Sequence, residues 1–110
     1  MTDVIKGYHA HIYFNEETLT VAESVIAEAD QLFDITVGRM HRKPVGPHPE
    51  WSCQLAFEND EFAKLIPWLI LNRKGLTVFI HPLTQNDLKD HTDFALWMGS
   101  IEPLKLDIFQ

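Results

Sequence analysis

The chain has 110 residues and a net charge of −7, and 45% of its residues are hydrophobic, including seven Phe and three Trp. This length predicts one domain, spanning residues 1–110, and the apolar content is enough for one packed core. The acidic balance argues against binding to nucleic acid, which needs Lys and Arg to neutralise phosphates, and against binding to an anionic membrane surface.

The cysteine content and the apolar runs predict the cellular location. Cys53 is the only cysteine, so an intramolecular disulfide is excluded and a reducing, cytoplasmic location is favoured. No basic N-terminal stretch precedes an apolar segment, so we expect no secretory signal. The longest apolar run, residues 65–71, contains Pro67 and is far shorter than the roughly 20 residues of a membrane span.

The first part of the chain predicts a strand, a helix and a second strand. Residues 7–14 alternate between two faces, which is typical of a strand. Asn15 is expected to cap an amphipathic helix of about fifteen residues, with Glu16 and Glu17 in its first turn. Residues 35–41 alternate again and predict a strand. The two faces of the first strand carry Tyr8, Ala10, Ile12 and Phe14 on one side, and His9, His11 and Tyr13 on the other.

The second part repeats this order after a long loop. Residues 42–50 contain three prolines and a glycine, and loops of this length are often functional. A third strand is expected at 51–57, and a helix capped by Asn59 or Asp60 then ends before Gly75, with Pro67 kinking it or lying in its first turns. The remaining expectations are a fourth strand at 76–80 and an edge strand at 104–108.

The order strand–helix–strand–strand–helix–strand predicts an α+β, ferredoxin-like βαββαβ fold: an antiparallel sheet with both helices on one face. The other face would carry several imidazoles and aromatic rings without a helix to cover them. Large apolar patches are seldom left exposed, so we expect the C-terminal tail or a second subunit to cover this face. On this ground the sequence predicts a homodimer, in which two sheets form a barrel.

Five of the six histidines fall in short clusters. His9 and His11 share one face of the first strand, and the predicted topology brings His81, at the end of the fourth strand, beside them. His48, between two prolines in the long loop, and His91, after Asp90 in the tail, can fold over the same face. Neutral imidazole is a common ligand of transition metals and an acid–base group near neutral pH, so the clusters indicate a metal or acid–base site.

Considered one at a time, these residues also have simpler structural interpretations. Any one of these histidines alone is more often a surface or core residue than a ligand, and His41 is expected to be a solvated strand end. The three tryptophans are expected in the core. A structural zinc site is disfavoured because such sites prefer cysteine.

Six short segments form a recognisable pattern along the chain: YHAHIY at 8–13, VGPHP at 45–49, HPLT at 81–84, DL at 87–88, DHTD at 90–93 and WMG at 97–99. Taken together, these segments resemble the DOPA 4,5-dioxygenase family, the small aromatic ring-opening dioxygenases of fungi and bacteria. They occur in the family's order and spacing over nearly the whole chain, and five of the six histidines fall in matching positions.

The resemblance implies a dimeric ferredoxin-like fold and extradiol cleavage of a catechol such as DOPA, with O2 and non-haem Fe(II), although another divalent metal such as zinc is possible. It implies His11, His48 and His81 as metal ligands, with His9 as the nearest substitute. His91, oriented by Asp90 or another acid, is the first candidate for the catalytic base, and His9 is the second. Tyr13 and Phe79 are expected to line the ring pocket.

Two alternatives to this enzyme stay open from the sequence. One is a metal-free oxygenase or isomerase on the same dimeric fold, with histidine as the base. The other is a small-molecule binding protein whose histidines hold zinc or an organic acid. Metal analysis distinguishes the first alternative from the proposed enzyme, and turnover distinguishes the second.

Overall fold

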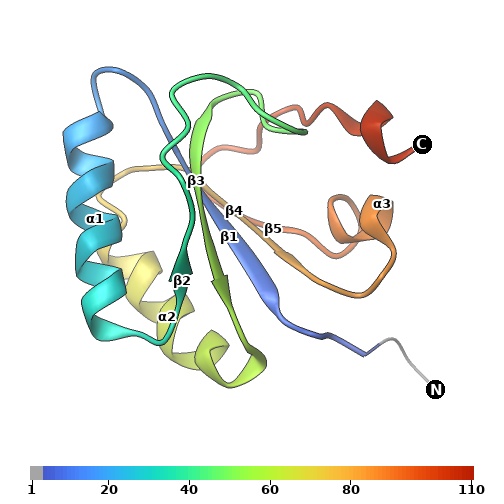
Figure 1. Cartoon of the computed structure of the whole chain (residues 1–110), viewed down its shortest axis with the longest axis horizontal. Helices are drawn as coiled ribbons and strands as arrows, with labels where there is room; N and C mark the ends of the chain where they lie inside the picture. Colours follow the sequence, from blue (N-terminus) through green and yellow to red (C-terminus); the bar gives the residue numbers. More distant parts are fainter. Residues whose placement is uncertain (1–3) are drawn as a thin grey trace.

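A computed structural model describes residues 4–110 as one antiparallel sheet with two long helices against it (Figure 1). The strand order is β2-β3-β1-β4-β5, and every neighbouring pair is antiparallel. The elements are β1 (Tyr8–Phe14), α1 (Leu19–Leu32), β2 (Thr36–Val37), β3 (Trp51–Phe57), α2 (Asn59–Asn72), β4 (Val78–Pro82), α3 (Asp87–Asp90), β5 (Leu96–Met98) and the 3-10 helix η1 (Leu106–Phe109).

The α+β class and the βαββαβ order expected from the sequence are confirmed for the first four strands. β3 lies between β1 and β2, and β1 lies between β3 and β4, which is the split βαβ arrangement. The sheet is open, with β2 and β5 at its edges, so the chain by itself forms no closed barrel over the described residues.

The core lies between the sheet and the two long helices. The helix-facing positions of β1 are Ala10, Ile12 and Phe14, and they are buried against apolar side chains of α1 and α2. Cys53 of β3 belongs to this core and is a free, buried thiol, as the apolar run around it predicts. None of the helices described in residues 4–110 is long and apolar enough to cross a bilayer. The cytoplasmic location stays a prediction.

The start of α1 differs from the expectation. The Asn15 carboxamide oxygen accepts a hydrogen bond from the backbone N–H of Thr18 (3.0 Å), which is a capping contact. The Thr18 hydroxyl in turn accepts from the backbone N–H of Asn15, so residues 15–18 close a separate turn. The helix begins only at Leu19, and Glu16 and Glu17 therefore precede it and do not lie in its first turn.

The second strand is shorter than the predicted 35–41, because a bulge interrupts it. Thr36 and Val37 pair with β3, and His41 forms an isolated bridge to Ser52. Between Val37, opposite Leu55, and His41, the β2 side has one residue more than β3, which breaks the ladder. A bulge interrupts the alternation of side chains, and the sequence pattern of residues 35–41 did not reveal this bulge.

The prediction of an edge strand at residues 104–108 was wrong. The edge position beside β4 is occupied by β5, whereas the segment expected as a strand at 104–108 ends in η1. The backbone N–H of Lys105 donates to the Pro47 carbonyl (2.8 Å), which ties this tail to the long loop rather than to the sheet. The apolar alternation of Leu104, Leu106 and Ile108 therefore belongs to a covering segment.

The chain itself covers the second face of the sheet, on which no long helix lies. The long loop, α3 and η1 lie on this side (Figure 1), and His11, Tyr13 and Phe79 are buried there. This removes the ground on which the sequence predicted a homodimer, because the face needs no second subunit to cover it. The dimer stays a prediction, which sedimentation at micromolar concentration tests.

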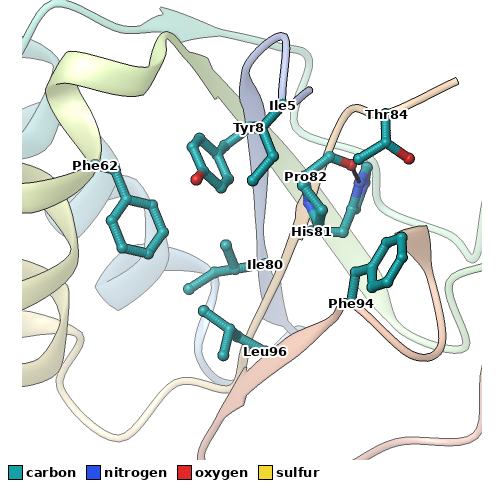
Figure 2. A pocket seen from close by; sticks show the side chains of 9 residues that line it. All are labelled: Ile5, Tyr8, Phe62, Ile80, His81, Pro82, Thr84, Phe94 and Leu96. Atoms are coloured by element: carbon teal, nitrogen blue, oxygen red, sulfur yellow. Dashed lines mark hydrogen bonds between the residues drawn. The ribbon is translucent and has the colours of Figure 1, made fainter. Parts of the chain in front are cut away.

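A cavity of about 450 Å³ opens on the helix side of the sheet, between α2 and β5 (Figure 2). Its walls are mainly apolar and include Tyr8, Phe62, Ile80 and Leu96. His81 also contributes to this lining, although alternation along β4 directs its ring to the opposite face from Ile80, where it joins the imidazole cluster described next.

Candidate metal centre

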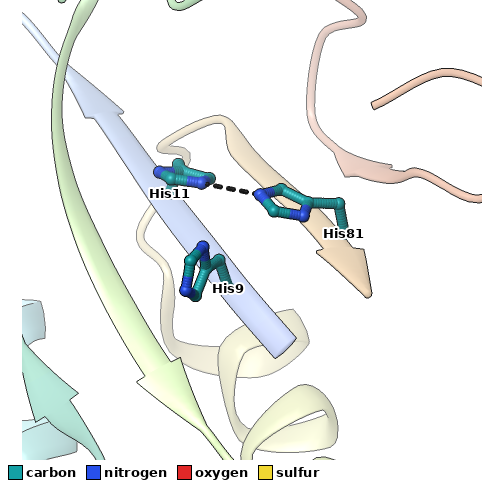
Figure 3. A group of neighbouring side chains, drawn as sticks. All are labelled: His9, His11 and His81. Carbon is teal, nitrogen blue, oxygen red and sulfur yellow. Dashed lines mark hydrogen bonds between the residues drawn. The ribbon is translucent and has the colours of Figure 1, made fainter. Parts of the chain in front are cut away.

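Three imidazoles meet on the second face of the sheet (Figure 3). His9 lies directly across from His81 in the β1–β4 register, and His11 follows two residues later on the same face of β1. One nitrogen from each ring lies within 4.8 Å of the others. A hydrogen bond of 3.1 Å joins Nε2 of His11 to Nε2 of His81. The strand pairing expected from the sequence therefore produces the convergence of these three residues.

Burial keeps these imidazoles neutral. His11 and His81 are only 5% and 3% exposed. Desolvation, together with the neighbouring imidazoles, lowers the pKa of His11 well below its usual value. Desolvation lowers the pKa of His81 to about 4, against a smaller opposing effect of its hydrogen bond to Pro82, and it also lowers the pKa of His9. Neutral imidazole is the form that binds a metal ion.

The backbone fixes the orientation of His81. Its Nδ1–H donates to the carbonyl oxygen of Pro82 (3.0 Å), so Nε2 carries the lone pair and faces His11. Histidines that bind metals commonly donate their second ring N–H to a backbone carbonyl in this way. The sequence motif His-Pro places that carbonyl one residue away.

His48 lies beside this cluster without belonging to it. Its ring centroid is 4.2 Å from that of His11, but its Nδ1 is hydrogen-bonded to the Tyr13 hydroxyl (2.8 Å). Desolvation, followed by the effect of other imidazoles, lowers the pKa of His48 to about 4. The set expected from the sequence was His11, His48 and His81, whereas the three that approach within 4.8 Å include His9 in place of His48.

His91 covers the cluster from the tail. Its ring lies 4.1 Å from that of His81 and 4.3 Å from that of Phe109, measured between centroids. Its Nδ1–H donates to the backbone carbonyl of Asp87 (2.7 Å), which leaves a lone pair on Nε2. Asp90, the expected partner, instead accepts hydrogen bonds from the backbone N–H and the hydroxyl of Thr84. Asp90 therefore holds the segment at Thr84, and the backbone carbonyl of Asp87 orients the His91 ring.

A pocket of about 280 Å³ adjoins all five histidines. This exceeds the roughly 150 Å³ in which a buried apolar cavity holds benzene, so one substituted aromatic ring can enter. Tyr13 and Phe79, expected as lining residues, lie behind the imidazoles and do not line it. The sequence missed two tail residues that line it, Ile108 and Phe109, because their segment was expected to be an edge strand. The lining comprises His9, His11, Pro47, His48, Gln54, His81, Leu83, Asp87, Asp90, His91, Ile108 and Phe109.

The donor set suits a transition metal. Imidazole nitrogens bind iron, zinc, copper or nickel, and the one buried carboxylate in the pocket, Asp90, is occupied by Thr84. Two imidazole nitrogens bound to one ion at about 2.1 Å lie about 3.0–3.4 Å apart. The 3.1 Å between the Nε2 atoms of His11 and His81 matches this separation. His9, His11 and His81 can therefore hold a metal ion.

The sequence profile of the Dopa 4,5-dioxygenase family matches residues 8–108. The chain belongs to this family. Among curated proteins, the chain is 30% identical over 111 residues to "DOPA 4,5-dioxygenase" of Amanita muscaria and 32% identical over 117 residues to an uncharacterized 21.2 kDa protein of Botryotinia fuckeliana. These matches cover 93% and 94% of the chain but only 49% and 64% of the two relatives, so the chain is much shorter than either.

A solved structure of the same fold is also similar. It is the crystal structure of a "putative dioxygenase" from Nostoc punctiforme PCC 73102, which is 40% identical to the chain and superposes with a TM-score of 0.92. The match covers 94% of the chain and 90% of that protein. This protein is therefore similar to the chain over almost its entire length.

Proposed function

We propose that this chain is an extradiol ring-cleaving dioxygenase, which opens a catechol such as DOPA beside its hydroxyl pair with O2 and non-haem Fe(II). The observation behind the proposal is the cluster of His9, His11 and His81 next to a pocket large enough for one aromatic ring. Family membership and the names of two relatives support an oxygenase reaction. In this reaction one ring C–C bond breaks and both atoms of O2 enter the product.

We assign the metal to His9, His11 and His81. This assignment replaces the set implied by the resemblance, because His9, and not His48, completes a group within 4.8 Å with His11 and His81. Bound Fe(II) would supply the route for electrons from the catechol to O2 and would lower the pKa of the catechol hydroxyls.

His91 is the proposed general base. Because its Nδ1–H is held by the Asp87 carbonyl, its Nε2 has a free lone pair to accept a proton from a substrate hydroxyl. The ring of Phe109 packs against the other side of this imidazole and, with Ile108, forms an apolar wall that would hold the substrate ring and exclude water.

Metal analysis tests the ligand assignment. Protein purified without chelators and then loaded anaerobically with Fe(II) should hold one equivalent, and His9→Ala, His11→Ala and His81→Ala should each lose it. His41→Ala is the matched control, since His41 lies outside the cluster and should retain iron. His48→Ala decides between the two ligand sets: retention of iron supports His9 as the ligand, whereas loss supports His48.

Turnover tests the reaction. On exposure to O2, the iron-loaded protein should convert DOPA or another catechol to a yellow ring-opened semialdehyde, with one O2 consumed per product. No yellow product across a panel of catechols would refute the enzyme proposal and favour a small-molecule binding protein. Turnover that persists after complete removal of metal would instead favour the metal-free oxygenase or isomerase.

A further inference from the structure

Two histidines that we do not assign to the metal lie beside the cluster. The His48 ring lies against that of His11 with centroids 4.2 Å apart and a tilt of 44°, and the His91 ring lies against that of His81 at 4.1 Å with a tilt of 35°. Both line the pocket. Each has its Nδ1 engaged by a different partner, a hydroxyl for His48 and a backbone carbonyl for His91. The two partners impose different tautomers.

The carbonyl of Asp87 can only accept, so His91 has its proton on Nδ1 and a lone pair on Nε2. The Tyr13 hydroxyl can donate, and a phenol is a much better donor than acceptor while an imidazole nitrogen is a good acceptor. Tyr13 is buried, and within residues 4–110 its hydroxyl has no hydrogen-bond partner besides His48. Its O–H therefore points to Nδ1 of His48, and the His48 proton lies on Nε2.

The Nε2–H of His48 is free to bind a ligand. No hydrogen bond to this atom occurs within the described part of the chain. No buried side-chain nitrogen or oxygen of residues 4–110 lacks a partner, so an unbonded Nε2 must reach open space. His48 lines two pockets, the one beside the three clustered imidazoles and a smaller one of about 170 Å³. His11 also lines both, so in either case the open space adjoins the cluster.

We propose that Tyr13 is a positioning residue that holds His48 as an Nε2–H donor, and that this N–H donates a hydrogen bond to a substrate oxygen in the pocket. The site then has a donor at His48 and an acceptor at His91, both of which line the pocket. A preorganised donor directed at an oxygen that gains negative charge stabilises the transition state without reorganisation. This role rests on the proposed function, whereas the tautomer of His48 does not.

Nitrogen-15 NMR of the histidine side chains tests the tautomers directly. In protein loaded with diamagnetic Zn(II), and again in metal-free protein, His48 should show Nε2–H and His91 should show Nδ1–H. In Tyr13→Phe, which removes only the hydroxyl, His48 should become a mixture of tautomers. Nδ1–H on His48 in the wild-type protein would overturn the proposal, and so would an unchanged tautomer in Tyr13→Phe.

Kinetics with a catechol test the role of the donor. Tyr13→Phe should lower kcat at least about tenfold with little change in KM and with iron content retained, because the donor is lost mainly from the transition state. His48→Gln, whose amide can also donate, should retain more activity than His48→Leu. Adding Tyr13→Phe to His48→Gln should then cost nothing further; additive losses would overturn the coupling.

The NMR and kinetic experiments distinguish failure of the proposed reaction from failure of the positioning role of Tyr13. If no catechol is turned over, the proposed reaction fails while the NMR result still decides whether Tyr13 sets the tautomer. If turnover is normal in Tyr13→Phe, the positioning role fails while the proposed reaction stands.

Discussion

Acid should destabilise the metal-free protein through its buried imidazoles. The pKa of His81 falls from 6.5 to about 4 on folding, mainly because burial disfavours the charged ring. Between these two values the unfolded chain binds a proton that the native chain does not, so stability is complete above pH 6.5 and is lost as the pH falls. At about pH 5, some 1.5 units below the unfolded value, His81 alone should cost about 2 kcal/mol, since one pKa unit is worth about 1.4 kcal/mol.

Urea unfolding measures this loss, with tryptophan fluorescence as the signal and a chelator present. The free energy of unfolding of the wild-type protein should fall by at least about 2 kcal/mol from about pH 7.5 to about pH 5. His81→Asn has no imidazole to protonate at this position, so its loss over the same range should be smaller by about 2 kcal/mol, whatever its stability at neutral pH. Equal losses in the two proteins would refute the burial argument for His81.

Two further predictions concern the core. Leu65→Ala should lower the free energy of unfolding by about 2–5 kcal/mol, because Leu65 is fully buried. Leu71 lies on the same helix but is 82% exposed, so Leu71→Ala should change this free energy by less than about 0.5 kcal/mol. Similar losses for the two variants in urea unfolding would contradict the assigned buried face of the helix. Burial raises the pKa of the Cys53 thiol to about 11, so a disulfide reagent should label this thiol slowly in native protein and at once in urea. Rapid labelling of the native protein would show that this part of the core is open.

The periodicity of side chains predicted most of the fold. β3 occupies the predicted residues 51–57, and the strand order is that of two split βαβ units. Local patterns failed where hydrogen bonding between distant segments decides the structure. The bulge in β2 depends on how His41 meets Ser52, and the C-terminal tail is held by a bond from Lys105 to Pro47, neither of which alternation can reveal.

The candidate site was predicted only in part, again because hydrogen bonds between distant segments decide the rest. His9, His11 and His81 converge through strand register, which the element order implies. The choice between His9 and His48 could not come from the sequence, because it depends on the Tyr13 hydroxyl binding a loop residue thirty-five positions away. Likewise, the partner of His91 is a backbone carbonyl, which every residue has and no motif indicates.

The sequence by itself thus determined that one sheet face gathers imidazoles, since alternation along β1 and β4 is a local property of extended backbone. Only the tertiary structure decided what each ring faces. The loop, α3 and the tail bury the cluster, while Tyr13 of β1 and Asp87 of α3 occupy one nitrogen each of His48 and His91, so that three imidazoles stay together and two lie beside them. Burial and hydrogen-bond partners, which set protonation and tautomer, come from segments far apart in the chain.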